Sequence, residues 1–147
     1  MATKDKLVKF LNQALELEHA ARIQYLAHAE EIDGLNAEPL MERLKEIASD
    51  EQKHEEVFRT LISDYLGGTC SMDLAKTVSA EAVSQILKVN LKAEKEAVDF
   101  YNTILEEAKK VKDELSYEYW KIEHEVRHVI LDEEEHIAEL KILLGQR

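Results

Sequence analysis

Two short stretches of the chain place a glutamate and a histidine three residues apart, each directly after an aspartate. They read Asp50-Glu51-Gln52-Lys53-His54 and Asp132-Glu133-Glu134-Glu135-His136. Positions i and i+3 of a helix lie on the same face, so the carboxylate and the imidazole of each stretch can bind one metal ion together. If both stretches are helical, the sequence offers two matching halves of a metal site.

The helical phase separates these two pairs from the other Glu-x-x-His matches, Glu16/His19 and Glu125/His128. Apolar side chains share the faces of Glu51 and Glu133, so we expect both pairs to be buried. These apolar residues are Leu44, Ile47, Val57 and Leu61 in one stretch, and Ile122, Val126, Val129 and Leu140 in the other. Buried charge is costly unless it is paired or binds a metal, which favours a metal site.

The remaining histidines are interpreted differently. Glu125 and His128 share a polar face with charged residues, which is typical of solvated surface. His124 and His128, four residues apart on that face, have the spacing of a weak surface metal site. His19 has an ambiguous phase and could lie at a subunit contact. His28 lies off the stripe that carries Glu18, and we assign it no catalytic role.

An internal repeat adds two further carboxylates. Residues 11–31 align with residues 87–107 so that Glu18 falls on Glu94 and Tyr25 on Tyr101. Each half then contains a glutamate, a tyrosine seven residues later and a Glu-x-x-His, and a pseudo-twofold axis would bring both sets to one central point. Taken singly, such residues are most often a surface glutamate, a hydrogen-bonded histidine and a core tyrosine. Their repetition in phase favours a shared metal site.

Four carboxylates and two imidazoles are the ligand set of di-iron and di-manganese helical bundles. The predicted metal ligands are Glu18, Glu51, His54, Glu94, Glu133 and His136. Tyr25 and Tyr101 are the predicted catalytic residues, because their hydroxyls could hydrogen-bond the ligand carboxylates and one could supply an electron during oxygen reduction. Carboxylate-rich sites accept iron and manganese alike, so the ligand types leave the metal open.

The periodicity of apolar residues predicts four long helices and a single all-α domain over residues 1–147. The predicted helices span about residues 4–33, 39–66, 79–111 and 115–144, with Pro39 at a first helical position and Ser79 as an N-cap. Residues 67–78 form the predicted connection, which begins at Gly67 and Gly68. A helix of about 28 residues is roughly 42 Å long, and twelve extended residues reach roughly 40 Å. The connection therefore permits one long crossover with the second and third helices parallel, which an up-down-up-down bundle would not need.

The composition limits the partners and the location. A formal net charge of −12 argues against nucleic acid, which binds to basic surfaces. No apolar run reaches the roughly 20 residues of a membrane span, and the N-terminus lacks the apolar region of a signal peptide. The single cysteine, Cys70, cannot form an internal disulfide, and we expect a reducing cytoplasm. Cys70 is assigned no function.

On these residues the chain resembles bacterioferritin and its relatives among the ferritin-like di-iron proteins. The resemblance covers nearly all of the four-helix region and implies that Glu51 and Glu133 bridge two irons. It further implies that Glu18 and His54 complete one iron site and that Glu94 and His136 complete the other. The implied activity is that of a ferroxidase, which oxidises Fe(II) with dioxygen or hydrogen peroxide, handles iron and protects against oxidative stress. A homo-oligomer is also implied, and we favour a dimer.

The chain departs from the bacterioferritin pattern in three places, which change what we expect for haem binding, cage assembly and the turn between the third and fourth helices. Gln52 stands where the resemblance would place the haem-ligating methionine, so we expect no intersubunit haem. Residues 137–147 are too few for the fifth helix that helps to close the cage of bacterioferritins, which argues against a storage shell. The interval from Glu94 to Glu133 also exceeds that from Glu18 to Glu51, which predicts a longer turn between the third and fourth helices.

The residue types leave three alternative functions open. A rubrerythrin-like peroxidase would use the same metal pair, although Ala97 stands where that family typically carries a further glutamate and the paired cysteines of a rubredoxin domain are absent. Chemistry like that of a manganese catalase fits the same ligands. A non-enzymatic metal-binding or structural helical module predicts that apolar replacements of the six residues would increase stability.

Overall fold

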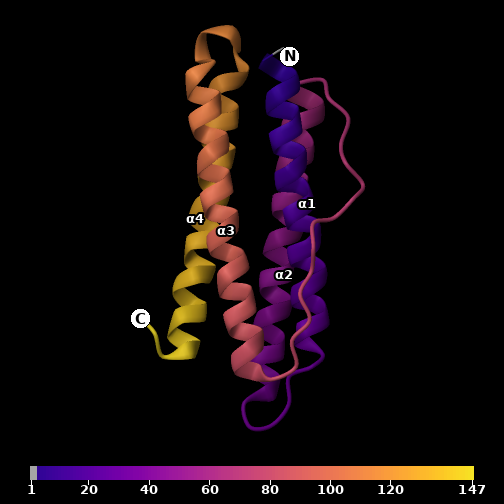
Figure 1. Ribbon diagram of the computed structural model, residues 1–147, viewed down its shortest axis with the longest axis vertical. Helices are drawn as coiled ribbons and strands as arrows, with labels where there is room; N and C mark the ends of the chain where they lie inside the picture. Colours follow the sequence, from indigo (N-terminus) through magenta and orange to yellow (C-terminus); the bar gives the residue numbers. More distant parts are fainter. Residues whose placement is uncertain (1–2) are drawn as a thin grey trace.

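The computed structural model describes residues 3–147, and the regular elements of this range are all helical. Four long helices run side by side as a bundle (Figure 1). They are α1 (Thr3–Ala29), α2 (Ala37–Thr60), α3 (Val83–Lys110) and α4 (Glu118–Leu144). A π-helical turn, η1 (Leu61–Tyr65), extends α2, and a 3₁₀ turn, η2 (Lys112–Glu114), lies between α3 and α4. The predicted all-α four-helix bundle is confirmed.

The connection between α2 and α3, residues 67–82, is the crossover. It contains no regular secondary structure and runs along the whole length of the bundle (Figure 1). As a result α2 and α3 point in the same direction, whereas α1 and α2 form one antiparallel hairpin and α3 and α4 form the other. The predicted long crossover is therefore present. No helix within the described residues combines the length and apolar character that crossing a bilayer requires.

Two predicted helix boundaries near the first turn were wrong by a few residues. Helix α1 ends at Ala29 rather than near Asp33, and a turn follows directly. Helix α2 begins at Ala37, after Asn36 in the left-handed region at φ 66°. Pro39 therefore occupies the third helical position rather than the first. It still lies within the first turn, where its missing N–H removes no helical hydrogen bond.

The predicted start of the third helix at Ser79 was also wrong, because α3 begins at Val83. The backbone of Val78 is occupied by side chains of α1: its N–H donates to Gln24 Oε1 at 2.8 Å, and its carbonyl lies 2.9 Å from His28 Nε2. Ala80 is buried in the apolar core. These contacts keep the end of the crossover extended against α1, so the helix starts later than local sequence suggests.

Side chains of α1 hold the start of the crossover in the same way. The Asn12 amide donates to the carbonyl of Thr69 at 2.9 Å and accepts from the N–H of Ser71 at 2.8 Å. The Ser71 hydroxyl donates to Glu16 Oε2 at 2.6 Å. The polar groups of an extended segment need such partners because no neighbouring strand supplies them. Helix α1 therefore fixes the crossover along its length.

The apolar core is divided into clusters that lie on either side of a polar layer. One cluster combines residues from the first parts of α1 and α4, the last parts of α2 and α3, and η1, among them Leu7, Leu11, Leu15, Phe58, Leu61, Ile104, Ile122 and Val126. The others include Ile32, Leu44, Ile47 and Ile86, and a smaller group of Leu87, Leu91 and Leu140. On each helix the residues between the clusters are the predicted metal ligands. The core thus positions the polar layer near the middle of the bundle.

We predict that Gly68→Ala destabilises the fold by about 1–3 kcal/mol, because the new methyl would overpack the start of the crossover. A Cβ at this position would lie 2.8 Å from both methyl carbons of Val8, whose branched side chain has little rotational freedom. Urea denaturation of the metal-free chain would measure the loss. In the double variant Gly68→Ala/Val8→Ala the two effects should be less than additive, and strict additivity would contradict this contact.

Candidate metal centre

The six predicted ligands lie together in the polar layer, and each is at most 3% exposed. Helices α1 and α3 each supply one glutamate, and α2 and α4 each supply a glutamate and a histidine one turn later. In chain order they are Glu18, Glu51, His54, Glu94, Glu133 and His136. All four helices therefore contribute to one site, which arises where the apolar stripe of each helix is interrupted.

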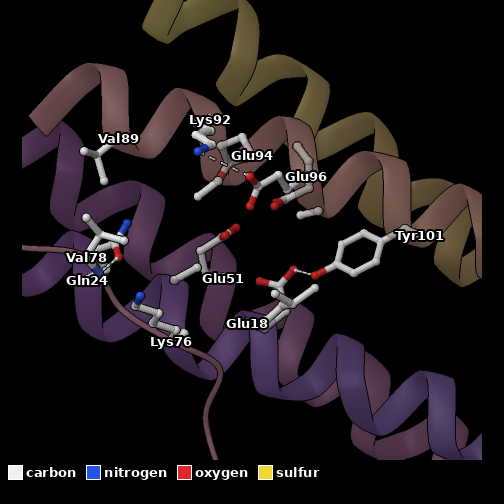
Figure 2. A pocket seen from close by; sticks show the side chains of 16 residues that line it. Glu18, Gln24, Glu51, Lys76, Val78, Val89, Lys92, Glu94, Glu96 and Tyr101 are labelled. Atoms are coloured by element: carbon white, nitrogen blue, oxygen red, sulfur yellow. Dashed lines mark hydrogen bonds and ion pairs between the residues drawn. The ribbon is translucent and has the colours of Figure 1, made fainter. Parts of the chain in front are cut away.

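The side chains form two overlapping groups. Glu18, Glu51, His54 and Glu133 offer ligand atoms within 4.8 Å of one another, and so do Glu51, Glu94, Glu133 and His136. Glu51 and Glu133 belong to both groups and lie at the centre. Figure 2 shows Glu51 pointing between Glu18 and Glu94. This arrangement has the form of two adjacent cation sites that share two carboxylates.

Several donor and acceptor atoms at the centre of the polar layer lack hydrogen-bond partners. Glu18 Oε2, both oxygens of Glu51, Glu133 Oε1 and His54 Nδ1 are buried without a hydrogen-bond partner. His54 Nδ1 lies 3.1 Å from Glu133 Oε1 and 3.2 Å from Glu51 Oε1, yet neither contact has hydrogen-bond geometry. Buried polar atoms without partners are rare and costly. Oxygen and imidazole-nitrogen donors that converge in this way suit a divalent metal such as iron.

The electrostatics of the site raise the pKa of three carboxyl groups. Burial, followed by the charge of Glu133, raises the pKa of Glu18 to about 7 and that of Glu94 to about 8. The same two causes raise the pKa of Glu51 well above its ordinary value. Without a cation, the site therefore holds protons on carboxyl groups that would be ionised in water.

Glu133 and the two histidines form the charged part of the metal-free site. Burial disfavours the charged form of Glu133, but contacts with His136 and His54 outweigh the effect of burial and lower the pKa of Glu133. For His136 burial is likewise outweighed, and contacts with Glu133 and Glu94 raise its pKa to about 11. Contacts with Glu133, Glu18 and Glu51 raise the pKa of His54 in the same way. The two imidazolium groups thus take the place that cations would occupy.

The two predicted tyrosines contact the glutamates across the pseudo-twofold axis. Tyr101 Oη donates to Glu18 Oε1 at 2.7 Å, and Tyr25 Oη donates to Glu94 Oε1 at 3.1 Å. Both phenols are buried, and burial together with the neighbouring glutamates raises the pKa of each hydroxyl well above its ordinary value. They therefore remain hydrogen-bond donors and orient the two outer carboxylates.

Two aspartates that helical periodicity did not single out also contact the site. His54 Nε2 lies 2.9 Å from Asp132 Oδ2, and His136 Nε2 lies 3.0 Å from Asp50 Oδ2. Each aspartate thus fixes the histidine of the other hairpin and leaves its Nδ1 facing the carboxylates. The signal for them was present in the sequence, because an aspartate precedes the glutamate in both repeats.

The other histidines lie outside the cluster. His19 Nδ1 is 2.7 Å from the carbonyl oxygen of Asp73, so its contact is with the crossover of its own chain. His28 is buried and contacts the carbonyl of Val78 in the crossover. His124 and His128 lie next to each other on α4, with ring centroids 4.3 Å apart.

We predict that the metal-free protein loses stability as the pH rises from about 5 to about 8. The pKa values of Glu18 and Glu94 rise from 4.5 in the unfolded chain to about 7 and 8 in the folded one. Between these values the folded state binds more protons, so the free energy of unfolding falls as the pH increases. The raised pKa of His136 acts in the same direction above its ordinary value of 6.5. Urea midpoints measured with a chelator at each pH would show the slope.

Glu94→Gln should flatten this pH dependence, because it removes one of the titrating groups. Glu106→Gln, at an exposed position of α3, is the matched control and should keep the original slope. Stability that is constant or increases over the same pH range would contradict the protonated state assigned to the site.

Comparison with known proteins places this architecture in a family. A bacterioferritin from Desulfovibrio desulfuricans is 28% identical over 110 residues, which cover 75% of this chain and 62% of that protein. The match thus spans less than two thirds of the curated relative's length.

Two solved structures share the fold. A ferritin-like, di-iron carboxylate protein from Bacillus anthracis superposes with a TM-score of 0.89 at 26% identity, covering 98% of this chain and 99% of that one. The bacterioferritin of Rhodobacter capsulatus, described with a metal-free dinuclear site and a haem iron, superposes with a TM-score of 0.85 at 22% identity. That alignment covers 96% of this chain and 84% of the other. The sequence of this chain also matches the family of the ferritin-like domain over residues 8–147. Because that match spans nearly the whole chain, the protein belongs to the ferritin family.

Proposed function

We propose that the chain binds two iron ions in the polar layer and oxidises Fe(II) with dioxygen or hydrogen peroxide. The observation that carries this proposal is the convergence of buried carboxylate and imidazole atoms that lack partners within the protein. Membership of the ferritin family supports iron handling as the role of the site. The proposed ligands are Glu18, Glu51, His54, Glu94, Glu133 and His136.

The two overlapping groups support a division of the ligands between the two ions. Glu51 and Glu133 would bridge, because they are the residues common to both groups. Glu18 and His54 would complete one ion, and Glu94 and His136 would complete the other. Both histidines would bind through Nδ1, because their Nε2 atoms face Asp132 and Asp50.

Two bound Fe(II) ions would supply one electron each, which with two protons converts hydrogen peroxide to two waters or dioxygen to hydrogen peroxide. The protein contributes geometry and charge. The Tyr25 and Tyr101 hydroxyls hold the outer carboxylates in place, and the apolar clusters close the polar layer on both sides along the bundle axis. The protonated carboxyls Glu18 and Glu94 would release their protons as cations bind.

A manganese-dependent enzyme and a rubrerythrin-like peroxidase are the alternatives that use the same residues. Ferritin-family membership and the likeness to a protein described as a di-iron carboxylate protein favour iron over manganese. The proposal also includes a homodimer, which light scattering of the purified chain would test. A purely structural layer is disfavoured because the six residues leave buried atoms without hydrogen-bond partners.

We predict that the metal-free chain binds about two Fe(II) per chain under anaerobic conditions, and that air or peroxide then produces a coupled diferric pair. Absorbance gives the stoichiometry and Mössbauer spectroscopy gives the coupling. Parallel titration with Mn(II) separates the manganese alternative, which predicts peroxide disproportionation by the manganese form. Electron paramagnetic resonance of the same reaction tests electron donation by tyrosine, which predicts a radical signal that Tyr101→Phe or Tyr25→Phe removes.

Glu51→Ala should abolish the diferric pair, because Glu51 belongs to both ligand groups. Glu106→Ala on the exposed face of α3 should bind and oxidise iron like the unsubstituted chain. Spectra of isolated ferric ions alone, or the absence of stoichiometric binding, would overturn the di-iron proposal. A stability gain on replacing all six residues with apolar ones, without loss of iron binding, would instead support a structural layer.

We further predict that Asp50→Asn and Asp132→Asn each weaken Fe(II) binding by about 10- to 100-fold, because each removes the acceptor that fixes a ligand histidine. The measurement is the dissociation constant of the metal-free chain for Fe(II). Glu135→Gln, exposed on α4, is the matched control for the loss of one negative charge. If the control weakens binding as much as Asp132→Asn does, the effect is general electrostatics rather than histidine positioning.

A further inference from the structure

A cavity of about 260 Å³ opens beside the polar layer, between α1, α3 and the crossover (Figure 2). Its inner end is formed by the four carboxylates and Tyr101. An apolar cavity of about 150 Å³ holds benzene, and sites for drug-sized molecules begin at roughly 300 Å³. The cavity is therefore larger than dioxygen or peroxide requires, and its size suits a compact organic molecule.

Four alanines lie among the residues that form the walls of the cavity, together with Leu17, Gln24, Val78 and Val89. Ala20 and Ala21 of α1 face Ala93 and Ala97 of α3 across it. Ala21 and Ala97 are equivalent positions of the internal repeat, so both hairpins present a small residue at the same place. Larger side chains would fill this space, since protein interiors are otherwise closely packed. The alanines therefore leave room for the apolar part of a ligand next to the polar layer.

Two lysines and one glutamate, Glu96, are the exposed charged residues that line the mouth of the cavity. Lys76 of the crossover and Lys92 of α3 flank it from two sides (Figure 2). Lys92 Nζ lies 4.0 Å from Glu96 Oε1, and both side chains are mostly exposed, so this ion pair contributes little. Lys76 and Lys92 outnumber Glu96 among the exposed charged residues that line the cavity. They offer ammonium groups to an anionic ligand.

The opposite side of the polar layer has the opposite charge. There Asp50 and Asp132 lie behind the two ligand histidines, and their side chains are 37% and 54% exposed. Cations are attracted to this acidic side, whereas the lysines favour anions at the cavity. Cation entry therefore does not account for the charge at the cavity mouth.

We propose that the cavity binds a small amphiphilic monocarboxylate, with its carboxylate at Lys76 and Lys92 and its apolar body between the alanines. The orientation follows from the lining, because the two lysines lie at the mouth of the cavity whereas the alanines line its walls. This inference deepens the proposed function and rests on it only in placing the apolar body beside bound metal ions.

Isothermal titration calorimetry of the full chain with hexanoate, hexan-1-ol and hexylammonium tests the inference, in metal-free and iron-loaded protein. Hexanoate should bind about two- to fivefold more tightly than hexan-1-ol, as expected for exposed charges, and hexylammonium should bind most weakly. Lys92→Gln should remove the advantage of hexanoate, whereas Glu96→Gln should increase it. Lys109→Gln, exposed in the last turn of α3 and away from the cavity, is the matched control and should change nothing.

Filling the cavity tests the place of the apolar body. Ala93→Leu and Ala21→Leu should each lower hexanoate affinity at least tenfold, because the new side chain occupies the space of the ligand. Ala138→Leu, exposed on α4, adds the same bulk away from the cavity and should bind hexanoate normally. Fe(II) stoichiometry measured on the filled variants shows whether the polar layer is intact.

The outcomes separate this inference from the proposed function. A chain that binds two Fe(II) but no hexanoate would overturn the inference and leave the proposed function in place. A chain that binds hexanoate at the cavity but no Fe(II) would support the inference and overturn the proposed function. Equal affinity for hexanoate, hexan-1-ol and hexylammonium would overturn the assignment of the anionic group.

Discussion

The burial of four carboxylates in one layer of the bundle is the constraint on which the rest of the structure depends. Like charges repel strongly in a medium of low dielectric constant, and burial raises the pKa of Glu18, Glu51 and Glu94. Such a layer lowers the stability of the metal-free fold unless cations or protons compensate it. The apolar clusters above and below provide the stabilisation that tolerates it. The apolar core therefore lies on both sides of the polar layer, because the polar site occupies the middle of the bundle.

The two hairpins support each other across the pseudo-twofold axis. Tyr101 of α3 orients Glu18 of α1, and Tyr25 of α1 orients Glu94 of α3. Asp50 and Asp132 also act across the axis, since each fixes the histidine of the other hairpin. Neither hairpin carries all the proposed ligands together with their supporting groups. Assembly of the site is therefore coupled to packing of the two hairpins, and the site cannot form before the tertiary structure does.

The crossover makes the two sides of the polar layer different, which a symmetric pair of hairpins would not do. It lies along α1, held by side chains such as Asn12 and His28 rather than by a neighbouring strand. It also brings Lys76 to the rim of the cavity beside the polar layer. The acidic side with Asp50 and Asp132 has no such cover. One element that contributes no metal ligand thus distinguishes the two approaches to the site.

The sequence by itself determined the number of helices, the residues of the polar layer and the repeat that relates them, because helical periodicity assigns each side chain to a face. The interruption of an apolar stripe by Glu51 and His54 was visible without coordinates for this reason. The tertiary structure decided which groups meet across the axis, where the crossover ends and where a cavity remains. Contacts such as Asp132 with His54, or Val78 with His28, join residues distant in the chain, and local periodicity contains no information about them. Ser79 illustrates the difference: its local sequence favours a helix start, but packing of the preceding backbone against α1 delays the helix to Val83.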